Sequence, residues 1–97
     1  MISIDPEGNE TRALDALVDL TGRSVLEIGA GYGRLTWRLA ARAKSVVALD
    51  VSDRDIGRAR SELAQDMRGR VRLLVADATT YRYPRSRFDV AVLSHSL

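Results

Sequence analysis

Residues 26–35 read LEIGAGYGRL, in which two apolar residues flank an acid and three glycines follow at every second position. The stretch joins a short β-rich segment, residues 24–28, to an apolar pattern with helical spacing. Glycine has no Cβ, so such a loop can turn tightly and let its backbone approach a ligand closely. We interpret residues 29–33 as a ligand-binding loop between a strand and a helix. A glycine-rich turn without a ligand is the alternative for this loop taken alone.

The rest of the chain repeats this alternation of strand and helix. Apolar runs bounded by turn residues predict further strands, and helical spacing predicts the helices between them. The strands are expected at 46–50, 71–75 and 88–93, and the helices at 35–43 and 52–69. Apolar strands that alternate with helices are typical of a parallel sheet covered on both faces.

The connections predict the order of the strands. Right-handed crossovers place the second and third strands successively on one side of the first, and the fourth then lies on its other side. The fold class is therefore predicted to be α/β, a Rossmann-like parallel sheet of four strands in the order 3-2-1-4. Residues 77–87 contain Pro84 and no helical stripe, and as a loop they can cross two strands. The glycine loop lies at the resulting switch point, where open α/β sheets bind ligands.

The N-terminal part is predicted to be a lead-in to this core. Apolar residues at helical spacing indicate an amphipathic helix over residues 10–20. We treat the chain as one domain of residues 1–97, with the lead-in over 1–22 and a βαβαββ core over 23–97.

Composition excludes several classes of protein. Apolar residues make up 45% of the chain and charged residues 29%, which is typical of a soluble domain and unlike a disordered or membrane-spanning chain. No cysteine is present, which excludes disulfides and thiolate metal sites, and we predict no metal.

The charges and the N-terminus bear on partners and location. Fifteen basic residues alternate with thirteen acidic ones, so no nucleic-acid-binding stripe is evident. The acidic N-terminus lacks a signal pattern, and we expect a cytoplasmic protein with no membrane partner.

The glycine loop departs from the two common phosphate-binding patterns. The dinucleotide fingerprint places its third glycine at position 34, which is Arg34, and a P-loop needs a lysine followed by Ser or Thr. Glu27 adds a carboxylate two residues before the loop. That charge would repel a pyrophosphate and attract an amino group or a positive sulfur.

Acids follow the next two predicted strands. Asp50 ends the second strand, nineteen residues past Gly31, where a carboxylate can accept both hydroxyls of a ribose. A helix-capping or surface role for Asp50 is the alternative. Asp77 follows the third strand and can accept from an exocyclic adenine amine, with the Ala78 N–H available to a ring nitrogen. An Asp after a strand is also a common turn residue.

Four segments in order resemble the motifs of a known enzyme family. VLEIGAGYGRLT, VVALDVS, LLVADATTYRYP and FDVAVLSHSL are similar to the successive motifs of class I S-adenosylmethionine-dependent methyltransferases, over residues 24–97. The small-molecule type is the most similar. The resemblance implies S-adenosyl-L-methionine as methyl donor, S-adenosyl-L-homocysteine as product and a small-molecule acceptor. It also implies direct displacement, in which the acceptor attacks the methyl carbon in line with the departing sulfur.

The resemblance also assigns roles to residues. The loop Gly29–Gly33 would pass under the methionine part of the cofactor, and Glu27 would help to orient its amino group. Asp50 would bind the ribose, and Asp77 with Ala78 would hold the adenine. The candidate cofactor-binding residues are Glu27, Gly29, Ala30, Gly31, Tyr32, Gly33, Asp50, Val51, Asp77, Ala78 and Ser94.

His95 is the candidate catalytic residue, because it follows the fourth strand where this family places residues near the transferred methyl. It could act as a general base. A loop histidine without chemistry is the alternative. Tyr32 could stack near the cofactor or lie on the surface, and Trp37 is expected in the core.

The chain ends after the fourth predicted strand, whereas a complete member of the family has seven strands. We therefore expect a fragment or a half-domain. The fourth strand, residues 88–93, would be an uncovered apolar edge through which the chain could self-associate. A non-catalytic S-adenosylmethionine-binding or interaction module is the alternative function, and an NAD-type oxidoreductase domain is a third.

Overall fold

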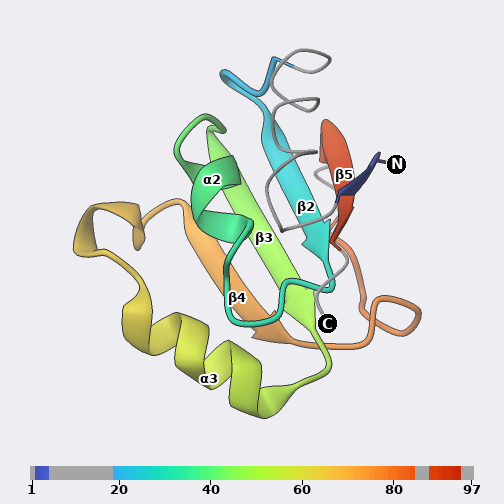
Figure 1. Ribbon diagram of the computed structural model, residues 1–97. Coiled ribbons are helices and arrows are strands. Elements are labelled where there is room, and N and C mark those ends of the chain that lie inside the picture. The colour runs from blue at the N-terminus through green and yellow to red at the C-terminus, as the bar shows by residue number, and fades with distance from the viewer. Residues whose placement is uncertain (1, 5–18, 85–87, 95–97) are drawn as a thin grey trace.

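The computed structural model describes residues 2–4, 19–84 and 88–94 of the 97-residue chain, and within them it forms one parallel sheet with helices (Figure 1). The elements in chain order are β1 (Ile2–Ile4), β2 (Ser24–Ile28), α2 (Thr36–Ala40), β3 (Ser45–Asp50), α3 (Asp53–Glu62), the 3-10 helix η1 (Gln65–Met67), β4 (Val71–Val75) and β5 (Val90–Ser94). The strand order is β1-β5-β2-β3-β4, and all neighbours are parallel. The predicted α/β class and the 3-2-1-4 order of the four core strands are confirmed.

β1 is an element that the sequence pattern does not predict. Its three residues pair with β5, with Ile2 opposite Val92 and Ile4 opposite Ser94. β5 therefore has a neighbouring strand on each side, and the expectation that it forms an uncovered edge is wrong. A three-residue strand is too short to carry a period-two pattern, so only its backbone pairing identifies it. The predicted lead-in helix falls mostly outside the described residues, and its last two residues, Asp19 and Leu20, are not helical.

The helices are shorter than their apolar spacing predicts. α2 has five residues, because the Arg70 guanidinium takes the carbonyls of Ala40 and Ala43 where a longer helix would continue. α3 stops at Leu63, whose backbone is extended with ψ 118°, and η1 follows. Leu63 and Met67 still pack against the core, so the helical spacing indicates burial correctly although the helix is interrupted.

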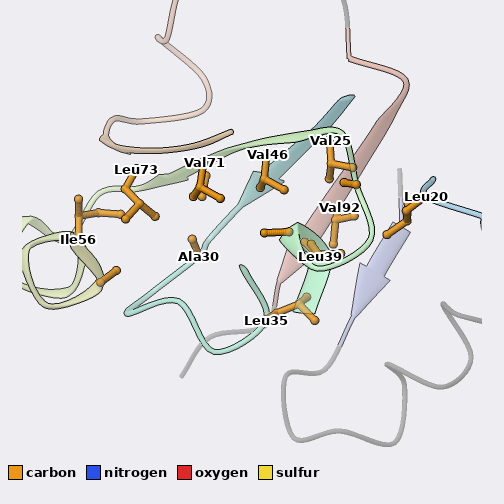
Figure 2. Packing of buried hydrophobic residues seen from close by; sticks show 14 residues of the cluster. Leu20, Val25, Ala30, Leu35, Leu39, Val46, Ile56, Val71, Leu73 and Val92 are labelled. Carbon is orange, nitrogen blue, oxygen red and sulfur yellow. The ribbon is translucent and has the colours of Figure 1, made fainter. Parts of the chain in front are cut away.

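The apolar core of the described residues lies between the sheet and the helices α2 and α3. Side chains alternate across a strand, so Val25 of β2, Val46 of β3 and Val71 of β4 point to the face that α2 and α3 cover. Figure 2 shows these residues gathered with Leu39 of α2 and Ile56 of α3. By the same alternation Glu27, two residues after Val25, points into the helix-covered face.

The capped start of α3 places the residues that follow β3. Ser52 is the N-cap, and its Oγ accepts a hydrogen bond from the Asp55 N–H at 3.1 Å. Among the described residues no helix has the length and apolar character to cross a membrane. The cytoplasmic location stays a prediction.

Candidate functional site

The glycine loop is fixed to the end of β3 by its backbone. The N–H groups of Gly29 and Ala30 both donate to the Leu49 carbonyl, at 2.9 and 3.0 Å. Gly29, Gly31 and Gly33 have positive φ values of 81°, 59° and 100°, a region that residues with a Cβ enter only with strain. The sequence places glycine at each of these positions, so the loop can turn sharply without that strain.

Asp50 holds the other side of the loop. Its Oδ2 accepts from the Gly31 N–H and its Oδ1 from the Ser52 N–H, both at 2.8 Å. Each carboxylate oxygen has about two lone-pair positions, so each can accept one further donor. Asp50 is half-buried and lies at the carboxyl end of β3, where a ligand with hydroxyl groups can reach it.

Asp77 and Ala78 form the wall beyond β4. Asp77 Oδ1 accepts from the backbone N–H of Thr79 at 2.8 Å and from its hydroxyl at 2.7 Å, and these two bonds lower the pKa of Asp77. The described part of the chain gives no donor to Asp77 Oδ2 and no acceptor to the Ala78 N–H. One acceptor and one donor therefore remain at the position where the sequence predicts adenine recognition.

A cavity of about 210 Å³ joins these groups at the carboxyl ends of β2, β3 and β4. Its lining consists of Ile28, Gly29, Leu49, Asp50, Val51, Ala76, Asp77 and Ala78. Five of the predicted site residues lie in this lining. The other three, Ile28, Leu49 and Ala76, are strand-end residues that the sequence reasoning did not select, although each is next to a residue that it did.

Glu27 is a buried carboxyl group directly before the cavity-lining residues Ile28 and Gly29 in the chain. It has no solvent exposure, and its two oxygens accept hydrogen bonds from different elements. The Thr36 hydroxyl of α2 donates to Oε1 at 2.5 Å, and the Ser94 hydroxyl of β5 donates to Oε2. Burial raises the pKa of Glu27, the two hydroxyl groups lower it, and the charge of Asp50 raises it further.

Other predicted site residues lie away from the cavity. Tyr32 is half-buried, and the Arg58 guanidinium of α3 lies 4.0 Å from the centre of its ring. The Ser94 hydroxyl points to Glu27, so this residue contributes to the site through Glu27. Gly33 lies under Trp37, since a Cβ there would come within 2.6 Å of that ring. Trp37 itself packs against the core, as expected.

His95 lies outside the described residues, so its role as a general base stays a prediction.

Thr36 is a residue of the site that the sequence does not indicate. It donates a hydrogen bond to Glu27, but a threonine in a helix pattern carries no functional signal by itself. Within residues 2–4, 19–84 and 88–94 no group of three or more His, Cys, Asp or Glu side chains could hold a metal ion.

A glycine loop at the switch point of a parallel sheet, with carboxylates at the ends of the next two strands, defines a Rossmann-like cofactor-binding domain. Comparison with known proteins identifies the family. Residues 25–97 match the family described as "Methyltransferase domain", and the chain belongs to it, as the N-terminal part of a class I S-adenosylmethionine-dependent methyltransferase domain.

Curated relatives of this chain include an uncharacterised methyltransferase and a ribosomal RNA methyltransferase. An uncharacterised methyltransferase of Mycobacterium tuberculosis is 37% identical over 84 residues, which cover 87% of this chain and 41% of the relative. A ribosomal RNA small subunit methyltransferase A of Anaeromyxobacter dehalogenans is 49% identical over 73 residues, which cover 75% of this chain and 22% of the relative.

A solved structure extends the comparison to three dimensions. Phosphoethanolamine N-methyltransferase 1 of Haemonchus contortus, in complex with phosphoethanolamine and S-adenosylhomocysteine, is 29% identical with a TM-score of 0.74, over 88% of this chain and 18% of that one. The chain spans less than half the length of each of these three proteins.

Proposed function

We propose that this chain forms the S-adenosylmethionine-binding part of an enzyme that transfers a methyl group to a small-molecule acceptor. The observation that carries the proposal is the cavity whose lining contains both Asp50 and Asp77. Family membership and the bound S-adenosylhomocysteine of the Haemonchus contortus enzyme support the same cofactor.

The residues present fit this cofactor. Asp50 has acceptor capacity for ribose hydroxyls, and Asp77 Oδ2 together with the Ala78 N–H can pair with one edge of adenine. The exposed apolar side chain of Val51 offers surface to a face of the ring. The volume of about 210 Å³ lies below the range of about 300–1,000 Å³ for complete ligand sites, which fits the adenosine end alone.

The chemistry requires little of the protein beyond position and electrostatics. When bound, S-adenosylmethionine supplies a methyl group on a positively charged sulfur, which is already reactive. Asp50 would fix the ribose, the glycine loop would allow the backbone to approach the amino-acid arm, and Glu27 would provide a negative charge beside the amino group. The candidate base, His95, would accept a proton from the acceptor.

Binding of S-adenosylhomocysteine tests the cofactor assignment. We expect calorimetric titration to give micromolar affinity for S-adenosylhomocysteine and no comparable affinity for NAD. Replacing Asp50 by alanine should weaken the binding about 10- to 100-fold, since hydrogen bonds to a charged group contribute about 1.5–3 kcal/mol each. Asp66→Ala removes an exposed acid of η1 and serves as the control, with unchanged affinity. Micromolar binding of NAD without S-adenosylhomocysteine would contradict the proposal.

The acceptor class needs a separate experiment. A small molecule is supported by the phosphoethanolamine acted on by the Haemonchus contortus enzyme and by the interspersed charges of this chain. The ribosomal RNA methyltransferase makes RNA the alternative. With labelled S-adenosylmethionine and a fractionated cell extract, we expect label in the low-molecular-weight fraction whether or not ribonuclease is added. Label confined to intact RNA would overturn the small-molecule assignment.

A further inference from the structure

Glu27 is a fully buried acid with an unusual set of partners. It lies on the helix-covered face of the sheet, among apolar residues of the core. Within the described residues the groups around it are the two hydroxyls of Thr36 and Ser94 and the carboxylate of Asp50, with no cation. A buried carboxylate without a cation is costly unless its oxygens accept hydrogen bonds, so the two hydroxyls are needed to keep it in place.

The two hydroxyls also fix the direction of the carboxylate. Thr36, the first residue of α2, donates its hydroxyl to Oε1 of Glu27, and Ser94, the last residue of β5, donates its hydroxyl to Oε2. These elements approach Glu27 from different directions: β5 is the neighbour of β2 in the sheet, and α2 lies in front of the sheet, over β3 (Figure 1). A carboxylate held at both oxygens cannot rotate, and about two of its four lone-pair positions remain for a donor from a ligand.

We infer that Thr36 and Ser94 are positioning residues, which aim Glu27 at the amino group of the cofactor and so give the site its preference for ligands that carry the amino-acid arm. The inference rests on the proposed function. Asp50 and Asp77 recognise the adenosine part, which every thioadenosine shares. The amino-acid arm is recognised separately, and its recognition depends on residues that do not line the cavity.

Two ligands separate this role from a general structural one. S-adenosylhomocysteine and 5′-methylthioadenosine both contain adenosine and a thioether sulfur, but only the first has an amino group for Glu27. In the full chain we expect Thr36→Val and Ser94→Ala each to weaken the binding of S-adenosylhomocysteine about 3- to 30-fold, less than the loss of a hydrogen bond to the ligand itself, because Glu27 keeps its charge and one of its two hydroxyl partners. Affinity for 5′-methylthioadenosine should change by less than about twofold.

The controls keep the test decisive. Thr36→Ser retains the hydroxyl and should restore the preference for S-adenosylhomocysteine. If Thr36→Val does not fold, Ser94→Ala carries the test from β5. Equal weakening of both ligands, or no weakening of either, would overturn the positioning role while leaving the proposed function intact. Failure of the unmodified chain to bind either ligand would instead overturn the proposed function.

Discussion

Gly29→Ala is expected to destabilise the domain and to abolish detectable binding of S-adenosylhomocysteine. Gly29 has φ 81°, which is unfavourable for a residue with a Cβ, and an added Cβ would lie 2.9 Å from the backbone oxygen of Ser94. A backbone atom inside a paired strand cannot move aside as a side chain can. β2 and β5 would therefore have to separate at their carboxyl ends, where the Ser94 hydroxyl of β5 donates a hydrogen bond to Glu27 of β2. Strain and displacement together should lower the free energy of unfolding by about 2–4 kcal/mol.

Two other glycines provide matched controls for this effect. Gly22 has φ 74° but open space where a Cβ would be, so Gly22→Ala isolates the backbone strain and should lower the free energy of unfolding by about 1–2 kcal/mol. Gly57 lies inside α3 with open space around it, so Gly57→Ala should stabilise the domain by about 0.5–1 kcal/mol. Denaturant unfolding and calorimetric titration measure all three variants. A Gly29→Ala protein as stable as Gly22→Ala, with unchanged affinity, would contradict the argument.

The sequence predicts the core strands and their order well because local and global signals agree there. β2 and β4 have the predicted bounds, and β3 begins one residue earlier, since short apolar runs between turn residues have few other structures available. β5 runs over Val90–Ser94 instead of 88–93, because Asp89 precedes the strand and its carboxylate accepts a hydrogen bond from the Ser24 N–H. The helix ends were predicted less well, since α2 ends at contacts from Arg70, which lies thirty residues away in sequence.

The cavity was predictable for a similar reason, and the environment of Glu27 was not. Residues at the carboxyl ends of adjacent parallel strands meet at one edge of the sheet, so Asp50 and Asp77 could be placed together from topology alone. The partners of Glu27 depend on side-chain direction and on the packing of α2 and β5 around β2. Nothing in the sequence marks Thr36 as the residue that reaches Oε1, or turns the Ser94 hydroxyl away from the cavity.

Glu27→Gln is expected to change stability and ligand affinity in opposite directions. The folded-state pKa of Glu27 is raised above its ordinary value of 4.5, chiefly by burial and also by the charge of Asp50. The folded chain therefore retains a proton that the unfolded chain releases. Stability is greatest below the unfolded pKa and falls as pH rises toward the folded pKa, by about 1.4 kcal/mol for each unit of the shift. Glutamine does not titrate, so the variant should lack this loss.

The amide can be accommodated in the same space, because the hydroxyls of Thr36 and Ser94 can each donate or accept. In urea unfolding, the stability of Glu27→Gln relative to the unmodified chain should therefore increase between about pH 4.5 and neutral pH. Glu62→Gln is the matched control, because Glu62 is exposed on α3 and its ion pair with Arg58 is on the surface. Its effect should be small at every pH, within about 1 kcal/mol.

Affinity should fall in the same Glu27→Gln variant that gains stability. The amide has no charge with which to bind a ligand ammonium group, and loss of one member of a buried charge pair costs at least about 2 kcal/mol, or about 30-fold in affinity. Calorimetric titration with S-adenosylhomocysteine at neutral pH measures this loss. Full affinity together with lower stability at all pH values would mean that Glu27 serves packing alone. A gain in stability accompanied by a loss of affinity would mean that the domain retains a destabilising buried acid because the site requires its charge.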